Sequence, residues 1–238
     1  MSERFYCPDS PQGGRFVLGP DESRHLARVC RLGAGDRVEL FDGRGFATAA
    51  EVIAASPEKT ELTPLGDPIP ERKSRFAVTL VTAVPKGERF DWLIEKATEL
   101  GVARLIPIVT VRSVVVPRGS KLDRLRRTIV EACKQSRRAR LMELEEPLDW
   151  LDAVRRFPDG TRLLGDPSGR PSTLWPAVLP GSEVVLTVGP EGGFTEAERQ
   201  LAIGSGWIPI RLGYNILRIE TAGLAGSAAL LARDAEAE

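Results

Sequence analysis

The chain has 238 residues, and its 33 lysines and arginines are balanced by 33 aspartates and glutamates, which gives a formal net charge of zero. Hydrophobic residues make up 42% and charged residues 28%, values typical of a globular protein that exclude disordered, collagen-like and coiled-coil chains. The length predicts one or two domains, no apolar run reaches the roughly 18 residues of a membrane helix, and no secretory signal peptide is expected. Three widely spaced cysteines and a single histidine predict a cytoplasmic protein with reduced thiols and without a metal site.

Residues 1–70 are predicted to form a small antiparallel β-domain. Segments that alternate in polarity or carry β-branched residues lie at 15–18, 37–41, 48–53 and 60–62, with glycine- and aspartate-containing turns between them. A proline- and glycine-rich stretch at 63–74 then separates this domain from the rest of the chain.

One helix is expected within this β-domain, starting after Asp21 as its N-cap. At about 100° per residue, one face of the helix presents three guanidinium groups outward. These belong to Arg24, Arg28 and Arg31. The opposite face, expected to pack inward, carries Leu26, Val29 and Cys30.

Residues 74–238 are predicted to form an α/β domain. Short apolar runs, as expected of strands buried on both faces, lie at 76–84, 105–109, 162–165, 184–188 and 208–212. Helical patterns separate these runs, so the strands are expected to form a mostly parallel sheet. In one such helix, residues 88–100, the apolar residues share one face, and Gly101 is the expected C-cap.

A second helix, capped by Ser120, carries most of the basic charge. Its apolar stripe comprises Leu122, Leu125, Ile129, Ala132 and Cys133. Between Arg118 and Arg140 there are nine basic and only two acidic residues, a local charge of +7 in a neutral chain. This asymmetry predicts a surface that binds a polyanion, although an ordinary solvated helix face has the same pattern.

The usual phosphate-binding loops are missing from the sequence: no GxxxxGK[ST] motif occurs, and the GxG fragments at 43–45 and 204–206 are predicted to be turns. Instead, Gly-Pro-Glu-Gly-Gly at 189–193 follows a predicted strand and precedes a capping box of Thr195 and Glu198. Its glycines leave backbone groups accessible to a flat heterocycle, and an ordinary tight turn is the alternative interpretation.

A second candidate segment, Leu-Gly-Tyr-Asn-Ile-Leu-Arg-Ile-Glu-Thr-Ala at 212–222, follows the last predicted strand. The apolar helix after it, 223–232, is expected to be buried, partly against another subunit. Arg218 and Glu220 are awkward to bury without a purpose, and a structural salt bridge between them is the alternative to a functional role.

Five segments occur in a fixed order along the chain: Lys-Gly-Glu-Arg at 86–89, Glu-Lys-Ala-Thr-Glu-Leu-Gly-Val at 95–102, Glu-Ala-Cys-Lys-Gln-Ser-Arg-Arg at 131–138, and the two segments at 189–193 and 212–222. In this order they resemble the small-subunit ribosomal RNA uridine-N3 methyltransferases (the RsmE type) of the SPOUT superfamily. The resemblance covers the whole chain. It implies a PUA-like RNA-binding β-barrel at 1–70 and a trefoil-knotted SPOUT methyltransferase domain at 74–238.

The resemblance also implies S-adenosylmethionine as the cofactor, held by three loops at a homodimer interface. The implied cofactor-binding residues are Leu164, Gly165, Asp166, Gly189, Pro190, Glu191, Gly192, Gly193, Leu212, Gly213, Ile216, Leu217, Arg218 and Thr221. Gly192 is expected to adopt a positive φ with its backbone facing the adenine. The implied partner is the 16S rRNA of the small ribosomal subunit, with no metal and no membrane involved.

On this resemblance, the expected reaction is methyl transfer to N3 of a uridine. The N3 proton must leave, and the charge that spreads onto the flanking carbonyl oxygens must be stabilised. Arg218 is the first candidate for that stabilisation. Glu191 or Glu220 is expected to take the proton or to hold the arginine, and the sequence does not rank the two.

RNA contacts are expected from Arg24, Arg28, Arg31, Lys86, Arg137, Arg138 and Arg140. His25 is expected to be a packing or RNA-edge residue and not a base. Two other functions remain open at this point: a SPOUT methyltransferase acting on another rRNA or tRNA site, and a non-catalytic RNA-binding factor in ribosome assembly.

Overall fold

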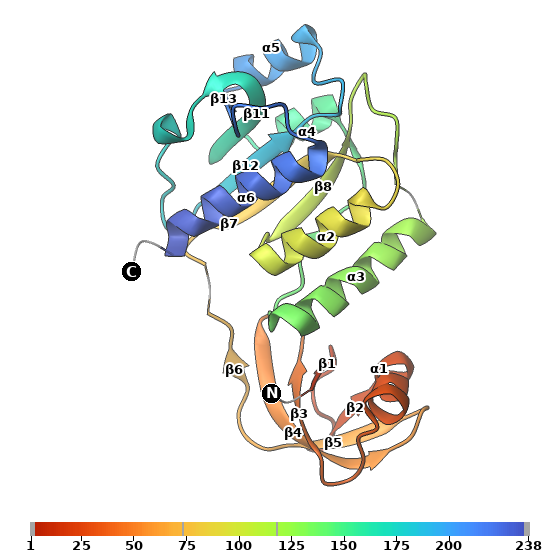
Figure 1. The fold of residues 1–238 in the computed structure, drawn as a ribbon. Coiled ribbons are helices and arrows are strands. Elements are labelled where there is room, and N and C mark those ends of the chain that lie inside the picture. Colours follow the sequence, from red (N-terminus) through yellow and green to blue (C-terminus); the bar gives the residue numbers. More distant parts are fainter. Residues whose placement is uncertain (1–2, 73, 118, 236–238) are drawn as a thin grey trace. The chain divides into compact units, whose positions relative to one another are not determined.

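The computed structural model describes residues 3–72, 74–117 and 119–235 (Figure 1). The chain divides into two compact units. The first comprises Met1–Lys73 with Val130–Leu141, and the second comprises Ser74–Ile129 with Met142–Glu238. The sequence predicted a single division at residues 70–74 and gave no sign that residues 130–141 belong with the N-terminal unit.

The first unit is built on a six-stranded sheet in the order β1-β3-β4-β5-β2, with β6 paired to β4. Its strands are β1 (Arg4–Tyr6), β2 (Phe16–Leu18), β3 (Arg37–Phe41), β4 (Phe46–Ala55), β5 (Thr60–Pro64) and β6 (Ile69–Pro70). The four predicted strands are confirmed as β2 to β5, and their pairings are antiparallel. The sequence did not predict β1, which pairs parallel with β3, or β6, because strands of two or three residues give no periodic signal.

The helix of the first unit begins earlier than predicted and changes its winding. α1 (Pro20–Arg24) has Gly19 and not Asp21 as its N-cap, and a π-helical turn, η1 (His25–Cys30), continues it. A π-helix has more residues per turn than the assumed 100° spacing allows. Leu26 is therefore buried as predicted, whereas Val29 is 66% exposed, contrary to the prediction. The predicted outward arginines are all exposed: Arg24, Arg28 and Arg31.

Residues 130–141 are held within the first unit by ion pairs. Lys134, whose side chain is only 10% exposed, lies 2.5 Å from a Glu22 oxygen and 2.8 Å from a Glu131 oxygen. Burial by itself would lower the pKa of Lys134, but the two carboxylates hold this pKa above its usual value. The charge of Lys134 is thus neutralised by carboxylates of the first unit.

A second cluster of charges holds the same segment. Arg4 donates to the backbone carbonyl of Cys133 at 3.0 Å and lies 2.7 Å from a Glu39 oxygen. The other oxygen of Glu39 accepts from Arg137, also at 2.7 Å. Arg137 therefore belongs to a structural network of ion pairs. The sequence had predicted only an RNA contact for this residue.

The first testable prediction concerns Lys134. Replacing Lys134 by alanine leaves Glu22, which is 14% exposed, without its cation. We expect the free energy of unfolding to fall by about 3 kcal/mol, the low end for removing one partner of a buried ion pair. Urea unfolding measures the effect, with the exposed Arg127→Ala as a control from the same helix. A loss no larger than that of the control would show that the pair does not hold the segment.

The second unit is a seven-stranded parallel sheet in the order β10-β8-β7-β12-β11-β13, with β9 paired to β8. Its strands are β7 (Ala77–Ala83), β8 (Arg104–Val109), β9 (Glu143–Leu144), β10 (Leu148–Asp149), β11 (Thr161–Arg170), β12 (Glu183–Val188) and β13 (Ile208–Ile210). The predicted parallel sheet is confirmed. β11 continues past the predicted end at residue 165, with an irregularity between Gly165 and Arg170, both of which pair with Ile210 of β13.

The helices of the second unit are α2 (Arg89–Leu100), the N-terminal part of α3 (Ser120–Ser136), α4 (Trp150–Arg156), α5 (Glu196–Gly204) and α6 (Ile219–Ala235), with a short 3-10 turn, η2 (Ser172–Leu174). α2 and α6 pack side by side, and α6 lies on β7 and β12 (Figure 1). The predicted C-cap Gly101 is confirmed, with φ 99°. The predicted apolar stripe of α3 is also confirmed, because all five of its residues are buried.

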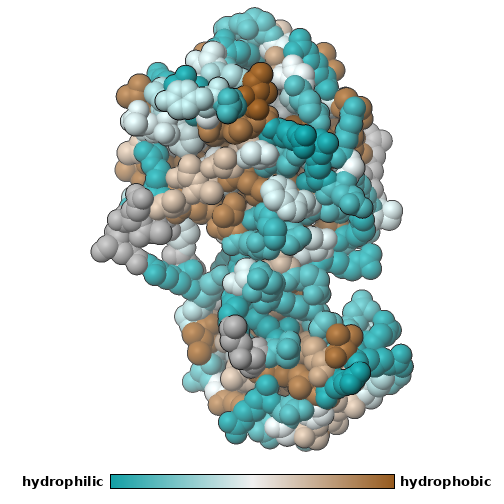
Figure 2. All heavy atoms as spheres, viewed as in Figure 1, coloured by the Kyte–Doolittle hydropathy of each residue, from teal (hydrophilic) through white to brown (hydrophobic). Residues whose placement is uncertain are grey.

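α6 approaches the sheet closely at two glycines. A Cβ on Gly226 would lie 2.5 Å from a methyl carbon of Leu186 on β12, and one on Gly223 would lie 3.2 Å from Leu80 on β7. The outward face of the helix carries Thr221, Ala225, Ala229 and Ala232. Figure 2 shows the surface over α6 in pale and dark brown, whereas the surface over α2 is mostly teal.

Candidate functional site

A pocket of about 340 Å³ opens at the carboxyl edge of the parallel sheet, within the range of small-molecule sites. Three segments line it: one lies within β11, where the strand becomes irregular, and the other two begin at the ends of the adjacent strand β12 and of β13. They are residues 164–167, residues 188–194, and residues from 211 to 219 without Tyr214 and Arg218. Arg199 of α5 and Ala222 of α6 complete the wall. The topology therefore brings together segments that are far apart in the sequence.

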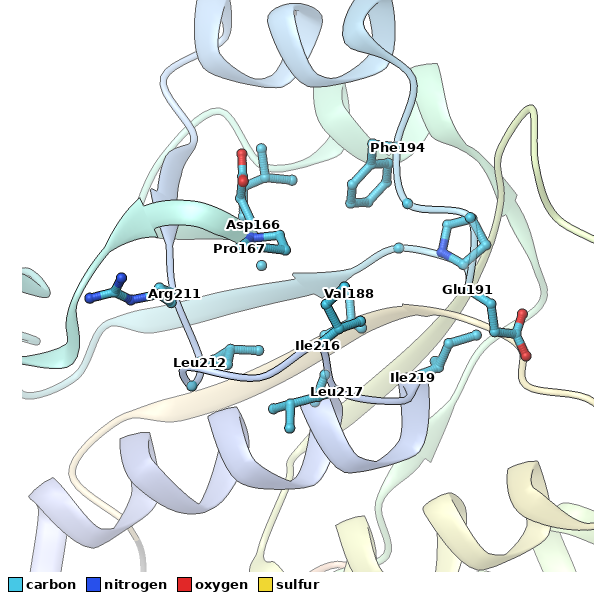
Figure 3. Close-up of a pocket in the computed structure, with 18 of the residues that line it drawn as sticks. Asp166, Pro167, Val188, Glu191, Phe194, Arg211, Leu212, Ile216, Leu217 and Ile219 are labelled. Carbon is cyan, nitrogen blue, oxygen red and sulfur yellow. The ribbon is translucent and has the colours of Figure 1, made fainter.

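Most of the predicted cofactor-binding residues line this pocket. They are Leu164, Gly165, Asp166, Gly189, Pro190, Glu191, Gly192, Gly193, Leu212, Gly213, Ile216 and Leu217. Arg218 and Thr221 do not line it, although both adjoin lining residues and both are exposed. Figure 3 shows the apolar side chains Val188, Leu212 and Ile216 in the middle of the site, with Arg211 and Glu191 at opposite edges of the view.

Glycine is required at different positions of the loop at 189–193 for different structural reasons. A Cβ on Gly189 would lie 2.9 Å from the ring of Phe194, which itself lines the pocket and stacks on Trp150 at 4.4 Å between ring centroids. Gly193 has the positive φ, 69°, and its N–H closes a turn onto the Pro190 carbonyl at 2.8 Å. The expected positive φ at Gly192 is wrong, because the left-handed position is the next residue.

A segment that the sequence analysis did not single out supports this loop from outside. Arg112 donates a short hydrogen bond to the Gly192 carbonyl, and a Cβ on Gly192 would lie 3.1 Å from Arg112 Cδ. Glu198 accepts from the backbone N–H of Val111 at 2.8 Å. The loop after β8 is thus hydrogen-bonded both to the glycine-rich loop and to the start of α5.

The predicted capping box at the start of α5 is confirmed. Thr195 Oγ1 accepts from the Glu198 N–H at 3.2 Å, and Glu198 Oε2 accepts from the Thr195 N–H at 2.8 Å. Glu198 is 7% exposed, and its two oxygens are both satisfied by these contacts and by Val111. A buried carboxylate with full hydrogen bonding fixes where the glycine-rich loop ends.

One side of the pocket holds an ion pair between Asp166 and Arg199. Arg199 Nε lies 2.5 Å from Asp166 Oδ2, and Oδ1 of the same carboxylate accepts from the N–H of Ser168 at 2.8 Å and from its hydroxyl at 2.7 Å. Burial by itself would raise the pKa of Asp166, but the hydrogen bonds from Arg199 and Ser168 outweigh it and hold the pKa below its usual value. Asp166 is therefore ionised at neutral pH and can fix one pocket wall.

The three candidate catalytic residues lie in different surroundings. Glu191 lines the pocket and is exposed. Arg218 is exposed and makes no ion pair with any residue that the structure describes. Glu220 is 6% exposed, and its ion-pair partner is Arg89 of α2, at 3.9 Å, so the salt bridge that the sequence allowed between Arg218 and Glu220 is not formed.

The residues predicted to bind RNA also differ in exposure and in ion pairing. Lys86 is exposed in the loop after β7, and the Arg140 side chain is exposed in the first unit. Arg137 pairs with Glu39, and burial lowers the pKa of the Arg138 guanidinium. Arg118, the first residue of the predicted basic segment, lies outside the described residues.

Two arginines of the predicted basic segment contact carboxylates that lie outside it. Arg124 lies 2.7 Å from Asp91, and Arg126 lies 2.9 Å from Asp123 and 3.5 Å from Glu146. The polyanion-binding face stays a prediction, and within it Arg124 and Arg126 have carboxylate neighbours. The exposed arginines of α1 and η1 are freer to contact a phosphate.

Several residues around the pocket were not among the predicted site residues, including Phe194, Arg199 and Arg211 in its lining and Arg112 behind the glycine-rich loop. Phe194 directly follows the glycine-rich loop and could have been included as its next residue. Arg199 reaches Asp166 because the start of α5 follows the capping box, and Arg112 reaches Gly192 across 80 residues. No local pattern predicts such contacts.

Two negative findings apply to the ranges 3–72, 74–117 and 119–235. No helix in them is long and apolar enough to cross a lipid bilayer. No group of three or more histidine, cysteine, aspartate or glutamate side chains in them is placed to hold a metal ion.

Comparison with known proteins identifies the family to which the chain belongs. An RNA methyltransferase domain matches residues 72–231, and an RNA methyltransferase PUA domain matches residues 18–65. The ribosomal RNA small subunit methyltransferase E of Synechocystis is 34% identical over 224 residues, which cover 91% of this chain and 72% of that protein.

Two solved structures resemble the whole chain. A Legionella pneumophila protein in complex with its bound cofactor SAM is 29% identical, with a TM-score of 0.90 over 98% of both chains. A ribosomal RNA small subunit methyltransferase E of Neisseria gonorrhoeae bound to S-adenosyl methionine is also 29% identical, with a TM-score of 0.86 over 98% of both chains. The predicted fold class, a PUA-like β-domain followed by an α/β domain with a parallel sheet, is confirmed, and the chain belongs to the ribosomal RNA small subunit methyltransferase E family of RNA methyltransferases.

Proposed function

We propose that this protein transfers a methyl group from S-adenosylmethionine to N3 of a uridine in the 16S rRNA of the small ribosomal subunit. The observation that carries the proposal is the pocket at the carboxyl edge of the sheet, lined by the loop at 189–193 and the segment at 212–217 in a chain of this family. The relatives' names support small-subunit rRNA as the substrate, and the uridine N3 atom comes from the resemblance of the sequence segments.

The pocket suits S-adenosylmethionine in size and in chemistry. Its middle is apolar, which matches an adenine ring and a methylene chain, and its edges carry Asp166, Arg199, Arg211 and Glu191. Gly189 keeps space for the Phe194 ring, so the wall is shaped by a position where no side chain fits. The carboxylate of Asp166 and the two guanidinium groups can bind the hydroxyl, ammonium and carboxylate groups of such a ligand.

When bound, S-adenosylmethionine supplies an electrophilic methyl group on its sulfonium. The chain must then position the uracil, remove the N3 proton and stabilise the charge on the flanking carbonyl oxygens. We assign the proton to Glu191, because this carboxylate lines the pocket whereas Glu220 is engaged with Arg89. We assign the charge stabilisation to Arg218, which follows the lining residue Leu217 and has a guanidinium free of ion pairs among the described residues.

A trefoil knot and a homodimer also belong to the proposal. The outward face of α6 consists of small residues, a surface that a second helix can approach closely. Tyr214, beside the pocket, is 97% exposed, and Ile216, in its lining, is 88% exposed, and large exposed apolar groups of this kind mark interaction sites. Light scattering gives the oligomeric state directly.

The proposal is tested by transfer of labelled methyl groups from S-adenosylmethionine to small-subunit rRNA that lacks the modification, followed by mapping of the modified nucleotide. Label in a uridine of 16S rRNA at N3 is the expected result. Label in tRNA or at another atom would overturn the assignment, and binding of RNA without transfer would point to a non-catalytic assembly factor.

A second testable prediction concerns the cofactor. In Gly189→Ala the new Cβ would lie 2.9 Å from Phe194, so the ring must move and the pocket must change shape. We expect the affinity for S-adenosylmethionine to fall about tenfold, a low value for overpacking a tight site. Calorimetric titration measures it, with Gly204→Ala as the matched control because nothing lies within 4 Å of that position. Equal affinities of Gly189→Ala and Gly204→Ala for S-adenosylmethionine would show that the Phe194 side of the pocket does not contribute to ligand binding.

A third prediction concerns RNA binding by the first unit. Arg28 is exposed, and Arg24 has only an exposed pair with Asp21 at 3.3 Å, which contributes little. We expect the double change Arg24→Glu, Arg28→Glu to weaken binding of 16S rRNA and to reduce the slope of log affinity against log salt by about 1.5, the value for two lost phosphate contacts. Arg137 and Arg138 are unsuitable for this test, because Arg137 pairs with Glu39 and burial lowers the pKa of the Arg138 guanidinium, so reversing either charge would also disturb the structure.

The control for this experiment is Arg155→Glu, a change at an exposed residue of α4 that has no ion pair among the described residues. Affinity for S-adenosylmethionine should stay the same in all variants. An unchanged salt slope in the double variant would mean that this face of α1 and η1 is only solvated.

A fourth prediction concerns catalysis. A planar guanidinium can hold two acceptors at once, which an ammonium group cannot do. We therefore expect Arg218→Lys to lower the single-turnover rate of methyl transfer at least about a hundredfold, the typical effect of losing one donor to developing negative charge. Thermal melting, light scattering and calorimetry should show an intact protein that still binds the cofactor. A rate close to that of the wild type would assign the stabilisation to backbone amides.

A further inference from the structure

Glu220 is a buried carboxylate whose hydrogen-bonding capacity is not used. It is 6% exposed, its Oε1 lies 3.9 Å from Arg89 Nε, and its Oε2 has no hydrogen-bond partner. A separation of 3.9 Å is too long for a hydrogen bond. A buried charge left in this condition is costly unless it serves a purpose.

The position of Glu220 in the fold stabilises its negative charge and also brings the residue near the pocket. It lies in the first turn of α6, where the helix dipole favours a negative group. Its neighbours Ile219 and Ala222 line the pocket, whereas Glu220 itself is directed toward α2. Glu220 thus adjoins the pocket wall along the chain and contacts α2 with its side chain.

Arg89 is the first residue of α2 and ends the segment Lys-Gly-Glu-Arg, to which the proposed reaction has given no role. Its side chain is 46% exposed, and Glu220 is its only ion-pair partner in the part of the chain that the structure describes. Because the Nε edge faces Glu220, the terminal nitrogens of the guanidinium are available for a second acceptor.

The loop that carries this segment leaves the sheet beside the glycine-rich loop. Thr82 of β7 pairs with Val188 of β12, so residues 84–88 and 189–193 emerge at the same edge. Lys86 is exposed in the first loop, and Trp92, one turn along α2 from Arg89, is 47% exposed. Cationic groups next to an exposed aromatic ring are the composition of single-stranded nucleic-acid surfaces.

We propose that Arg89 binds a backbone phosphate of the RNA strand that carries the target nucleotide, and that Glu220 is the positioning residue that holds the guanidinium for it. This inference rests on the proposed function, because it names the part of the RNA that this edge of the site recognises. It replaces the earlier alternative in which Glu220 takes the N3 proton. The carboxylate, the guanidinium and the phosphate would then form one line of charge-assisted contacts.

The experiment compares Arg89→Ala, Arg89→Lys, Glu220→Gln and the double variant Arg89→Ala, Glu220→Gln by RNA binding and single-turnover methylation of unmodified small-subunit rRNA. Arg89→Ala should weaken RNA binding about tenfold and reduce the salt slope by about 0.7, the value for one phosphate on a single strand. Arg89→Lys should keep the salt slope and lose part of the affinity. Arg155→Ala is the matched control.

The double variant tests whether Glu220 acts through Arg89. Glu220→Gln alone should raise the half-saturating RNA concentration, with a much smaller effect on the rate at saturation. In the Arg89→Ala background the same change should have no further effect, because residues that act as one unit are not additive. Affinity for S-adenosylmethionine should remain the same throughout.

Three results would overturn the inference. An unchanged salt slope in Arg89→Ala, with only a lower melting temperature, would make the pair purely structural. Additive effects of the two changes would separate Glu220 from Arg89. Loss of the acid limb of the pH–rate profile in Glu220→Gln would make Glu220 the proton acceptor. A wild-type protein that binds rRNA but transfers no methyl group would instead refute the proposed function, and the binding arm of the test would still decide the role of Arg89.

Discussion

The site depends on three neighbouring parallel strands, because it lies where β12 and β13 end and where β11 becomes irregular. β12 pairs with β11 and β11 pairs with β13, so residues 164–167 of β11 and the segments that follow β12 and β13 lie side by side although they are far apart in the sequence. Ligands of open parallel sheets bind outside the carboxyl ends of the strands for this reason. Small residues then allow close packing: a Cβ on Gly165 would lie 2.8 Å from the Thr187 carbonyl oxygen, and one on Gly226 would lie 3.0 Å from Leu212 in the pocket wall.

Charge is used in two ways in this neutral chain. Within the first unit, Lys134, Arg4 and Arg137 are paired with carboxylates and hold residues 130–141 in place. Around the pocket, Asp166 is fixed by Arg199, whereas Arg218 has no ionic partner among the described residues. A guanidinium that is not neutralised by a protein carboxylate retains its charge for a ligand, so the arginines paired within the first unit at Glu39 contribute stability, and Arg218 keeps its charge for a ligand.

The sequence predicted what local patterns encode. Runs of apolar residues located the strands that carry the site, and the capping box of Thr195 and Glu198 predicted where α5 begins. The two motif segments predicted most residues of the pocket, because each loop is continuous in the chain. The contacts of Arg112 with Gly192 and of Arg89 with Glu220 could not be predicted in this way, since each joins residues that only the folded sheet brings together. The exposure of Val29 was mispredicted for a different reason, namely that the winding of the helix changes at η1.

Three carboxylates in or next to the pocket lining differ in the contacts that their surroundings leave open. Asp166 accepts three hydrogen bonds, from Arg199 and Ser168, so it can orient a wall but has little basicity left. Glu220 is buried with an unused oxygen and faces Arg89, which makes it suited to position that guanidinium. Glu191 is exposed on a glycine-rich loop whose conformation is set by Gly193 and Arg112, and it can reach a ligand without first breaking an ion pair. A buried base would be more basic, but the N3 proton of a bound uracil can pass from an exposed carboxylate to solvent without leaving an uncompensated charge inside the protein.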